Sequence, residues 1–363
     1  VGNVVIDAQT GDDQIDMFSR WAAAAKSKGA AFIMQVSHAG RQTPKLVNSR
    51  PAAPSPVALG LPGGQFGEPR AMTQDEIRNV VDGFGRATKL AKRAGFDGVQ
   101  VHAAHGYLLS SFLSPLANRR EDDWGGPLEN RARLLVDCVR EAKVQGGKAF
   151  SVSVKLNSAD FQKGGFSHED CLKVIDILNG LGVDFVEISG GNYEQPKMMD
   201  MEGLEPSFEE TKRTSTRERE AYFLSYAKSV QDRASMPLMV TGGFRTLAGM
   251  NAAVDASEAD LIGIGRPLCV DTETPAKLLS GAIEAADRWE SRLRIGPGIF
   301  GPNSPIKLIK ALNGFGAQGW YYEQIRLLAA NKMPDPEMGV LQAFMAHQRR
   351  ESSSAKTWRA AMP

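Results

Sequence analysis

The sequence predicts an α/β fold, a barrel of the (β/α)₈ type in which the first two βα units are missing, with a C-terminal helical extension. Short apolar segments rich in Val, Ile and Phe alternate with longer amphipathic segments over residues 12–265. The spacing of roughly 30–50 residues is typical of βαβ units that build a parallel sheet. Only six such strands can be found, and the first unit begins with a helix. We therefore expect two units to be absent before Val1.

Each predicted strand is a short apolar run bounded by turn residues, as buried parallel strands are. The six runs are Ala31–Val36, Gly98–His102, Phe150–Leu156, Phe185–Ser189, Pro237–Thr241 and Ala259–Gly265.

The segments between the strands carry apolar residues at three- and four-residue spacing, which predicts helices. Thr73 with Glu76 predicts a capping box, and Ser167 predicts a second helix start. Gly95 and Gly182 are expected at helix ends. The predicted helices are Asp12–Lys28, Thr73–Ala94, Glu129–Gln145, Ser167–Leu181, Thr216–Arg233 and Leu247–Ala256.

The pattern changes after Gly265, so we predict a barrel domain at 1–294 and a helical extension at 295–363. The polar last dozen residues are expected to be loose. The extension and the segment before it are expected to contain a helix at Glu273–Arg294, a loop at Ile295–Pro305, and helices at Ala317–Asn331 and Glu337–Arg350.

The composition excludes several classes of protein. The chain has 363 residues, and its 43 Lys and Arg residues against 42 Asp and Glu residues give a net charge of +1. This balance argues against nucleic-acid and membrane-surface partners, and no apolar run is long enough to span a bilayer. Cys138, Cys171 and Cys269 form no CxxC pair, which argues against disulfide and cysteine-ligated metal sites and favours a cytoplasmic location.

Two imidazoles and a phenol follow the second predicted strand, in the run His102-Ala-Ala-His105-Gly-Tyr107. The carboxyl ends of the strands are where barrels carry their catalytic groups. Paired ring nitrogens can stabilise a developing oxyanion, and a nearby phenol can deliver a proton. The alternatives are a structural core histidine or a zinc pair, but the HxxH run lacks the Glu of HExxH. No metal is predicted.

Glycine-rich turns follow the last two predicted strands, at Gly242-Gly243 and Gly265-Arg266. Adjacent turns with backbone N–H groups and one arginine are typical of a barrel phosphate site. The alternative is that these glycines only allow tight turns.

Lys155 ends the third predicted strand, where a buried amine is costly unless it has a function. It could hydrogen-bond an electron-rich heterocycle or form a Schiff base, and its position in the sequence does not decide between them.

Two other motifs favour structural interpretations. Gly314–Gly319 matches GxGxxG but lacks the following βαβ unit of a dinucleotide site, so we interpret it as a structural turn. The basic run His347–Arg350 is interpreted as a solvated helix end.

A long segment of this chain resembles the signature of the Old Yellow Enzyme family of FMN-dependent oxidoreductases. It comprises GFDGV, HxxHGYL, FLSP, NxRxDxWGG and ENR within residues 95–131. SHAGR, KLNSADF, STREREAYF, TGGFRT and GIGRPL agree in order and place, so the resemblance covers roughly residues 1–270. The C-terminal extension is similar to that of longer fungal members, and the two histidines are those of the His/His branch.

The resemblance implies FMN as cofactor and NADPH or NADH as hydride donor. It places Gln35 and Lys155 against the flavin ring, and Gly242, Gly243, Gly265 and Arg266 at its phosphate. His102 and His105 would grip the oxygen of an α,β-unsaturated carbonyl substrate, an enone or enal. Tyr107 would protonate the α-carbon while the β-carbon takes hydride. One pocket serving both partners predicts ping-pong kinetics.

The two absent units lead to further expectations. An open barrel exposes sheet edges, which favours association into a homo-oligomer. We expect weak FMN binding unless another segment or subunit fills the gap. Two other functional interpretations stay open, a truncated, flavin-free inactive homologue and a Schiff-base lyase that uses Lys155.

Overall fold

A six-stranded parallel sheet forms the centre of the computed structural model, which describes residues 4–197, 203, 207–208 and 223–361. Its strand order follows the chain, with β1 and β8 at the two edges among the described residues. All six predicted strands are confirmed. They are β1 (Ile33–Val36), β4 (Gly98–Ala103), β5 (Ser151–Asn157), β6 (Val186–Ser189), β7 (Leu238–Thr241) and β8 (Leu261–Gly263).

Helices separate the strands, which confirms the predicted α/β architecture. The part of the predicted Thr216–Arg233 helix before Phe223 lies outside the described residues. A two-stranded ribbon, β2 (Ala52–Ala53) with β3 (Arg70–Ala71), lies in the long connection after β1. The helices that accompany the sheet are α1 (Asp12–Lys26), α2 (Gln74–Arg93), α3 (Leu108–Leu113), α4 (Leu128–Gly146), α5 (His168–Leu181), α6 (Leu224–Gln231) and α7 (Leu247–Asp255).

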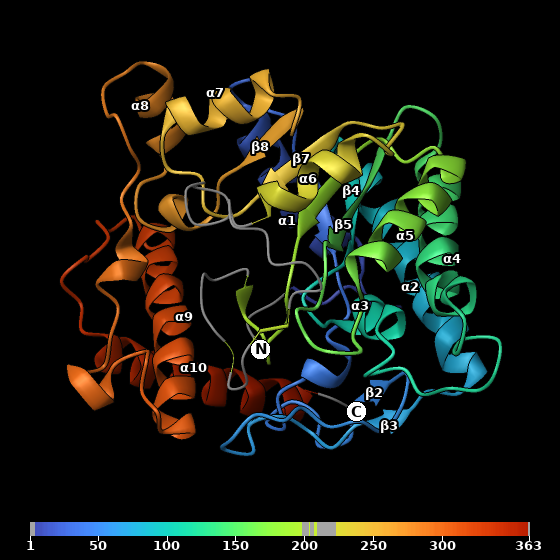
Figure 1. Cartoon of the computed structure of the whole chain (residues 1–363), viewed down its shortest axis with the longest axis horizontal. Helices are drawn as coiled ribbons and strands as arrows, with labels where there is room; N and C mark the ends of the chain where they lie inside the picture. Colours follow the sequence, from blue (N-terminus) through green and yellow to red (C-terminus); the bar gives the residue numbers. More distant parts are fainter. Residues whose placement is uncertain (1–3, 198–202, 204–206, 209–222, 362–363) are drawn as a thin grey trace.

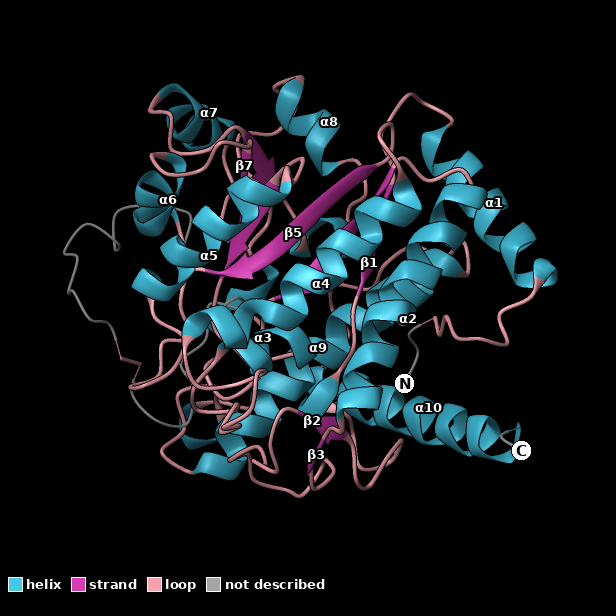
Figure 2. Ribbon diagram, turned by 90° about the vertical axis from the view of Figure 1, so that its right-hand side faces the viewer, coloured by secondary structure: helices cyan, strands magenta, loops and turns pink. Residues whose placement is uncertain are grey.

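The helices cover one face of a curled sheet (Figures 1 and 2), as in an incomplete barrel. Side chains alternate between the two faces of each strand. One face carries fully buried aliphatic residues that pack into the main core with α2, α4 and α5, among them Val99, Val101, Val152, Val154 and Ile188. The opposite face is therefore available for other groups.

Capping residues and glycines begin and end the helices where the sequence predicts. Thr73 accepts a hydrogen bond from the Glu76 N–H, and the Glu76 carboxylate accepts one from the Thr73 N–H, which completes the capping box. Ser167 caps α5 by accepting from the Asp170 N–H. Gly95 and Gly182 have φ values of 84° and 62°, left-handed conformations that glycine adopts without the cost of a Cβ.

The prediction of one helix over Glu273–Arg294 is wrong. The structure has a short helix, α8 (Thr274–Leu279), followed by turns and one 3₁₀ turn at Trp289–Ser291. Gly281 at φ 72° stops α8. The predicted loop at Ile295–Pro305 is confirmed, with a 3₁₀ turn at Gly298–Phe300.

The two C-terminal helices are longer than predicted. They are α9 (Lys307–Ala329) and α10 (Val340–Ala361), which together form the side of the molecule away from α2, α4 and α5 (Figure 1). The polar residues from Ser352 to Ala361 are helical rather than loose. A second apolar cluster joins both helices to the barrel, including Val270, Leu293 and the fully buried Trp320.

The interpretation of Gly314–Gly319 as a turn is also wrong, because these residues lie inside α9. A Cβ on Gly316 would lie 2.7 Å from Val340 Cγ1, and one on Gly319 would lie 3.4 Å from the Phe344 Cα and His347 Cβ atoms. The glycines therefore allow α10 to approach α9 closely, which a sequence match to a phosphate-binding pattern does not reveal.

In the part of the chain that the structure describes, no helix is long and apolar enough to cross a bilayer.

Candidate functional site

The face of the sheet opposite the aliphatic core is polar. The pairing register places Gln35 beside Gln100, His102 beside Lys155, and Lys155 beside Glu187. Since residues on one face follow a period of two, these side chains share one face over four neighbouring strands. This face ends at the carboxyl edge of the sheet, where α/β barrels place their ligands.

His102, His105 and Tyr107 come together at this edge, at the end of β4. The His102 ring centroid lies 5.2 Å from that of His105 and 5.0 Å from that of Tyr107. The structure thus brings together all three residues that the sequence predicted as catalytic. Nδ1 of His102 is buried and has no hydrogen-bond partner among the described residues, so it is available to a bound polar group.

The turn that carries these rings is held in an unusual conformation. His105 has a φ of 61°, and Gly106 follows at 75°. The His105 N–H donates to Asn157 Oδ1 at 3.0 Å, and its carbonyl accepts from Gln42 Nε2 at 2.9 Å. A Cβ on Gly106 would lie 2.8 Å from both Asn192 and Gln42. Residues that follow β1 or end β5 therefore stabilise a backbone conformation that a non-glycine residue rarely adopts, as is common at functional sites.

Both imidazoles are neutral at physiological pH. Burial, reinforced by the Lys155 ammonium, lowers the pKa of His102 to about 3. Burial, then Lys155 and His102, lower the pKa of His105 well below its usual value. Ser189 Oγ lies 2.7 Å from His105 Nε2 and fixes that ring. Neutral imidazoles can donate hydrogen bonds to an oxyanion without first losing a proton.

Tyr107 keeps its proton over the physiological range. Burial raises the pKa of Tyr107, and the hydrogen bond with Tyr193 partly offsets this. The two hydroxyl oxygens are 2.9 Å apart. A protonated phenol beside two neutral imidazoles can act as a general acid.

A hydrogen-bonded ladder links Gln35 to Lys155 across the polar face. Gln35 Nε2 donates to Gln100 Oε1 at 2.6 Å, and Gln100 Nε2 donates to Glu187 Oε2 at 2.9 Å. Glu187 Oε1 in turn pairs with Lys155 Nζ at 2.7 Å. Burial raises the pKa of Glu187, but Lys155 and the other donors outweigh it and hold that pKa below its usual value. Lys155 is therefore paired as a cation, whereas a Schiff-base lysine reacts as a free amine.

The two glycine turns lie side by side, because Thr241 at the end of β7 pairs with Gly263 in β8. Gly242 and Gly243 have φ values of 124° and 100°. Apart from its own chain neighbours, no atom of the described residues lies within 4 Å of the position a Cβ on Gly265 would occupy. Arg266 begins a 3₁₀ turn beside these glycines, with its guanidinium 3.6 Å from the Glu290 carboxylate. Gly265 is exposed, and open space beside it next to the Arg266 cation would fit a phosphate group.

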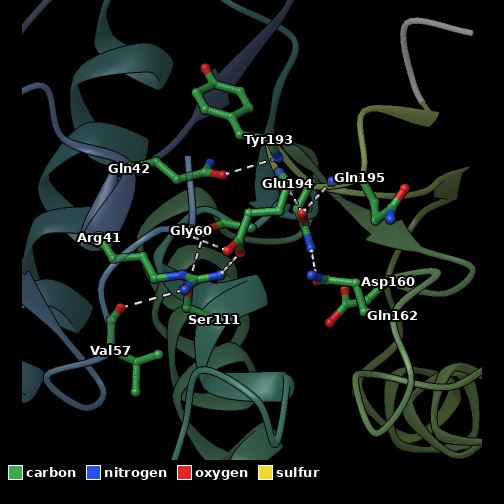
Figure 3. Close-up of polar contacts among 12 residues, drawn as sticks. Arg41, Gln42, Val57, Gly60, Ser111, Asp160, Gln162, Tyr193, Glu194 and Gln195 are labelled. Carbon is green, nitrogen blue, oxygen red and sulfur yellow. Dashed lines mark hydrogen bonds and ion pairs between the residues drawn. The ribbon is translucent and has the colours of Figure 1, made fainter. Parts of the chain in front are cut away.

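The sequence analysis missed a buried polar network under the site (Figure 3). Arg41 pairs with Glu194 at 2.5 Å, with side-chain exposures of 7% and 19%. The Gly60 N–H donates to Glu194 Oε1 at 2.8 Å, and the Tyr193 N–H donates to Gln42 Oε1 at 3.4 Å. The network fixes the loop that follows β6 and places Tyr193 beside Tyr107. No pattern in the sequence joins these residues, because the paired positions lie far apart along the chain.

No group of three or more His, Cys, Asp or Glu residues that could hold a metal ion occurs among the residues the structure describes.

The polar sheet face, the imidazole pair and the glycine turns define a barrel-type α/β protein with a polar site at the carboxyl edge of its sheet. The chain belongs to the NADH:flavin oxidoreductase / NADH oxidase family, whose model matches residues 8–284. The family signature predicted from residues 95–131 is therefore confirmed. The cofactor of this family is FMN, with NAD(P)H as the electron donor.

Curated relatives come from both fungi and bacteria. The NADH-dependent flavin oxidoreductase nadA of Aspergillus parasiticus is 39% identical over 281 residues, which cover 76% of this chain and 60% of that protein. The NADH-dependent flavin oxidoreductase iccE of Talaromyces variabilis is 33% identical over 346 residues, 89% of this chain and 81% of that protein. The match to iliE of Neonectria sp. covers 37% of that protein, so the chain spans well under two thirds of some relatives.

Solved structures agree with the fold. The Old Yellow Enzyme homologue from Zymomonas mobilis superposes with a TM-score of 0.62 at 26% identity, covering 77% of this chain and 76% of the other. Morphinone reductase in complex with tetrahydroNAD gives a TM-score of 0.59 at 26% identity, covering 76% of this chain and 72% of the other. These relatives are Old Yellow Enzyme family members with barrel folds.

Proposed function

We propose that this chain is an FMN-dependent NAD(P)H oxidoreductase that reduces the C=C bond of α,β-unsaturated carbonyl compounds. The observation that carries the proposal is the clustering of neutral His102 and His105 with protonated Tyr107. The centroid of the His102 ring lies 5.2 Å from that of His105 and 5.0 Å from that of Tyr107. Family membership supplies the cofactor class. The matched relatives are named for NADH-dependent flavin oxidoreduction.

Gln35 and Lys155 are the residues that would face the flavin ring, and Gly242, Gly243, Gly265 and Arg266 those that would hold its phosphate. The buried, unpartnered Nδ1 of His102 and the open space at Gly265 support a bound ligand along this edge. FMN held by these residues would supply the hydride for the substrate β-carbon, with NAD(P)H as its source.

The chain's own residues would stabilise the developing charge and supply the proton. The imidazole N–H groups of His102 and His105 donate to the carbonyl oxygen and stabilise the negative charge that develops there, which is worth roughly 3 kcal/mol for a well-placed donor. Tyr107 gives its hydroxyl proton to the α-carbon, so that the alkene gains one hydride and one proton.

Tyr107→Phe tests the proposal with the smallest change. Removing a general acid should lower the rate of enone reduction by about 10²–10⁴-fold. The effect should be confined to this half-reaction, because only the protonation of the substrate uses the hydroxyl. Flavin reduction by NADH, which needs no such proton, should stay within about twofold of the wild type. The two half-reactions are measured separately by anaerobic stopped-flow absorbance.

Wild-type protein that takes up FMN but transfers no electrons from NADH to an enone would contradict the proposal. Protein that retains no FMN at all would instead favour the flavin-free homologue. Borohydride trapping of a carbonyl compound on Lys155 would support the lyase interpretation, which its ion pair with Glu187 does not favour.

A further inference from the structure

A segment that follows the family match is attached to the candidate phosphate site. The match ends at residue 284, and the residues that follow run beside the loop after β7. The Ala286 N–H donates to the Arg245 carbonyl at 2.7 Å, and Ala285 forms an antiparallel bridge with Thr246. The segment after residue 284 therefore lies against the first of the two glycine turns.

Glu290 in this segment joins the arginines of both turns. Its Oε1 atom accepts a hydrogen bond from the Arg245 guanidinium at 2.6 Å, and the same atom lies 3.6 Å from the Arg266 guanidinium. Arg245 follows the turn after β7, and Arg266 follows the turn after β8. One carboxylate oxygen thus bridges the two turns that would hold a phosphate.

The C-terminal helix α9 holds the other oxygen of this carboxylate. The Tyr321 hydroxyl donates to Glu290 Oε2 at 3.2 Å. The neighbouring Trp289 packs beside the fully buried Trp320 of α9, with ring centroids 6.2 Å apart. The loop after β7 and helix α9 therefore fix the Glu290 side chain from two sides.

Glu290 carries its negative charge in this position. Burial raises the pKa of Glu290, but Arg266 and Arg245 outweigh burial and hold that pKa below its usual value. The side chains of Arg245, Glu290 and Arg266 are 4%, 19% and 18% exposed, so water screens their charges only in part. The carboxylate therefore subtracts one elementary charge from the positive charge that the two arginines bring to these turns.

We propose that Glu290 is a specificity-determining residue of the phosphate site: it holds the two turns together and weakens their attraction for anions, so that a phosphate binds firmly only as part of FMN. Two adjacent arginines without a carboxylate attract small anions of many kinds, free phosphate among them. With the carboxylate in place, contacts of the flavin ring must supply part of the binding free energy. The inference rests on the proposed function, which places the flavin phosphate at these turns.

Glu290→Gln tests the inference, because it removes the charge and keeps the shape of the side chain. The dissociation constants of FMN, riboflavin and inorganic phosphate are measured by isothermal titration calorimetry. The variant should bind FMN and inorganic phosphate about tenfold more tightly than the wild type, because a negative charge near the anion is gone. Riboflavin, which lacks the phosphate, should bind equally to both proteins.

A second comparison avoids leaving Arg245 beside a neutral side chain, which could unfold the protein. In a chain that carries Arg245→Met, adding Glu290→Gln removes the carboxylate after its buried partner has already been replaced. The added change should again tighten the binding of FMN and inorganic phosphate about tenfold and leave that of riboflavin unchanged.

Glu169→Gln is the matched control, because it makes the same chemical change at the surface of α5, where Glu169 pairs with Lys173. It should change none of the three dissociation constants. Arg266→Met tests the phosphate site itself and should weaken the binding of FMN and inorganic phosphate, but not that of riboflavin.

The outcomes separate the two proposals. Wild-type protein that binds FMN no more tightly than riboflavin would overturn the phosphate site of the proposed function and this inference with it. A preference for FMN that Arg266→Met abolishes, with FMN and phosphate affinities that Glu290→Gln leaves unchanged or lowers in both backgrounds, would overturn the inference alone. Equal losses of affinity for FMN and riboflavin in Glu290→Gln would mark a purely structural residue and would also overturn it.

Discussion

Burial of His102 makes the stability of the protein depend on pH. The pKa of His102 is about 3 in the folded protein, and that of an unfolded histidine is about 6.5. Between these values the unfolded chain binds the extra proton, so the free energy of unfolding should fall as the pH falls from about 6.5, by up to ~1.4 kcal/mol per pH unit.

His102→Gln removes this titration and should give a flatter dependence between about pH 6.5 and pH 5 than the wild type. Urea unfolding at several pH values measures it. Parallel curves for the two proteins would mean that the pKa of His102 is the same in the folded and the unfolded protein, and would contradict the burial of a neutral imidazole below pH 6.5.

The Lys155–Glu187 pair offers a second test, because 14% and 7% side-chain exposure leave it largely desolvated. Breaking one partner leaves a buried, uncompensated charge, so Lys155→Met alone should lower the free energy of unfolding by about 3–5 kcal/mol. Replacing both, in Lys155→Met with Glu187→Leu, should recover much of that loss. A double mutant as unstable as the sum of the single mutants would show that the pair is not coupled.

The candidate catalytic residues could be found from the sequence because His102, His105 and Tyr107 lie within six consecutive positions after one strand. The hydrogen-bond partners of the site residues could not be found from the sequence. Tyr193 meets Tyr107 only after β4, β5 and β6 pair in register, and Gln100 and Glu187 join Gln35 to Lys155 through the same register. A single sequence shows no pattern that links residues 86 or 87 positions apart.

At the scale of elements, strands and capped helices were predictable because periodicity and cap residues are local. The full length of the first C-terminal helix was not predictable, since α9 is apolar on several sides and contains three glycines, Gly314, Gly316 and Gly319. In α9 the glycines serve the approach of α10, a tertiary reason that outweighs their low helix propensity. The same residues in isolation are typical of a turn.

Gly316→Ala tests this explanation. A Cβ there would lie 2.7 Å from Val340 Cγ1, so the substitution should lower the free energy of unfolding by about 1–3 kcal/mol through overpacking. Val340→Ala in the same protein should relieve the clash.

Gly180→Ala in α5 is the matched control, because no atom lies within 4 Å of its Cβ position. It should raise the free energy of unfolding by up to about 1 kcal/mol through helix propensity. Equal effects at the two glycines would contradict the packing role of Gly316.

At the scale of the whole molecule, the strand order of the open sheet determines where each group of the candidate site lies. The polar face of the sheet spans β1 to β6, the glycine turns follow β7 and β8, and α9 closes on the loop after β6. The order of strands around the sheet therefore sets which end of a flavin each group would meet. Three expectations stay predictions: the division of the chain into a barrel domain at 1–294 and an extension at 295–363, the association into a homo-oligomer, and weak FMN binding.

The most direct measurement is the visible absorption of the purified protein after incubation with FMN and removal of free flavin. Even weak binding should leave part of the flavin on the protein, and the account predicts that the spectrum of this flavin bleaches with NADH or NADPH under anaerobic conditions and returns when an enone is added. A folded protein that retains flavin, yet whose spectrum is unchanged by the reduced nucleotide or does not return with the enone, would contradict it.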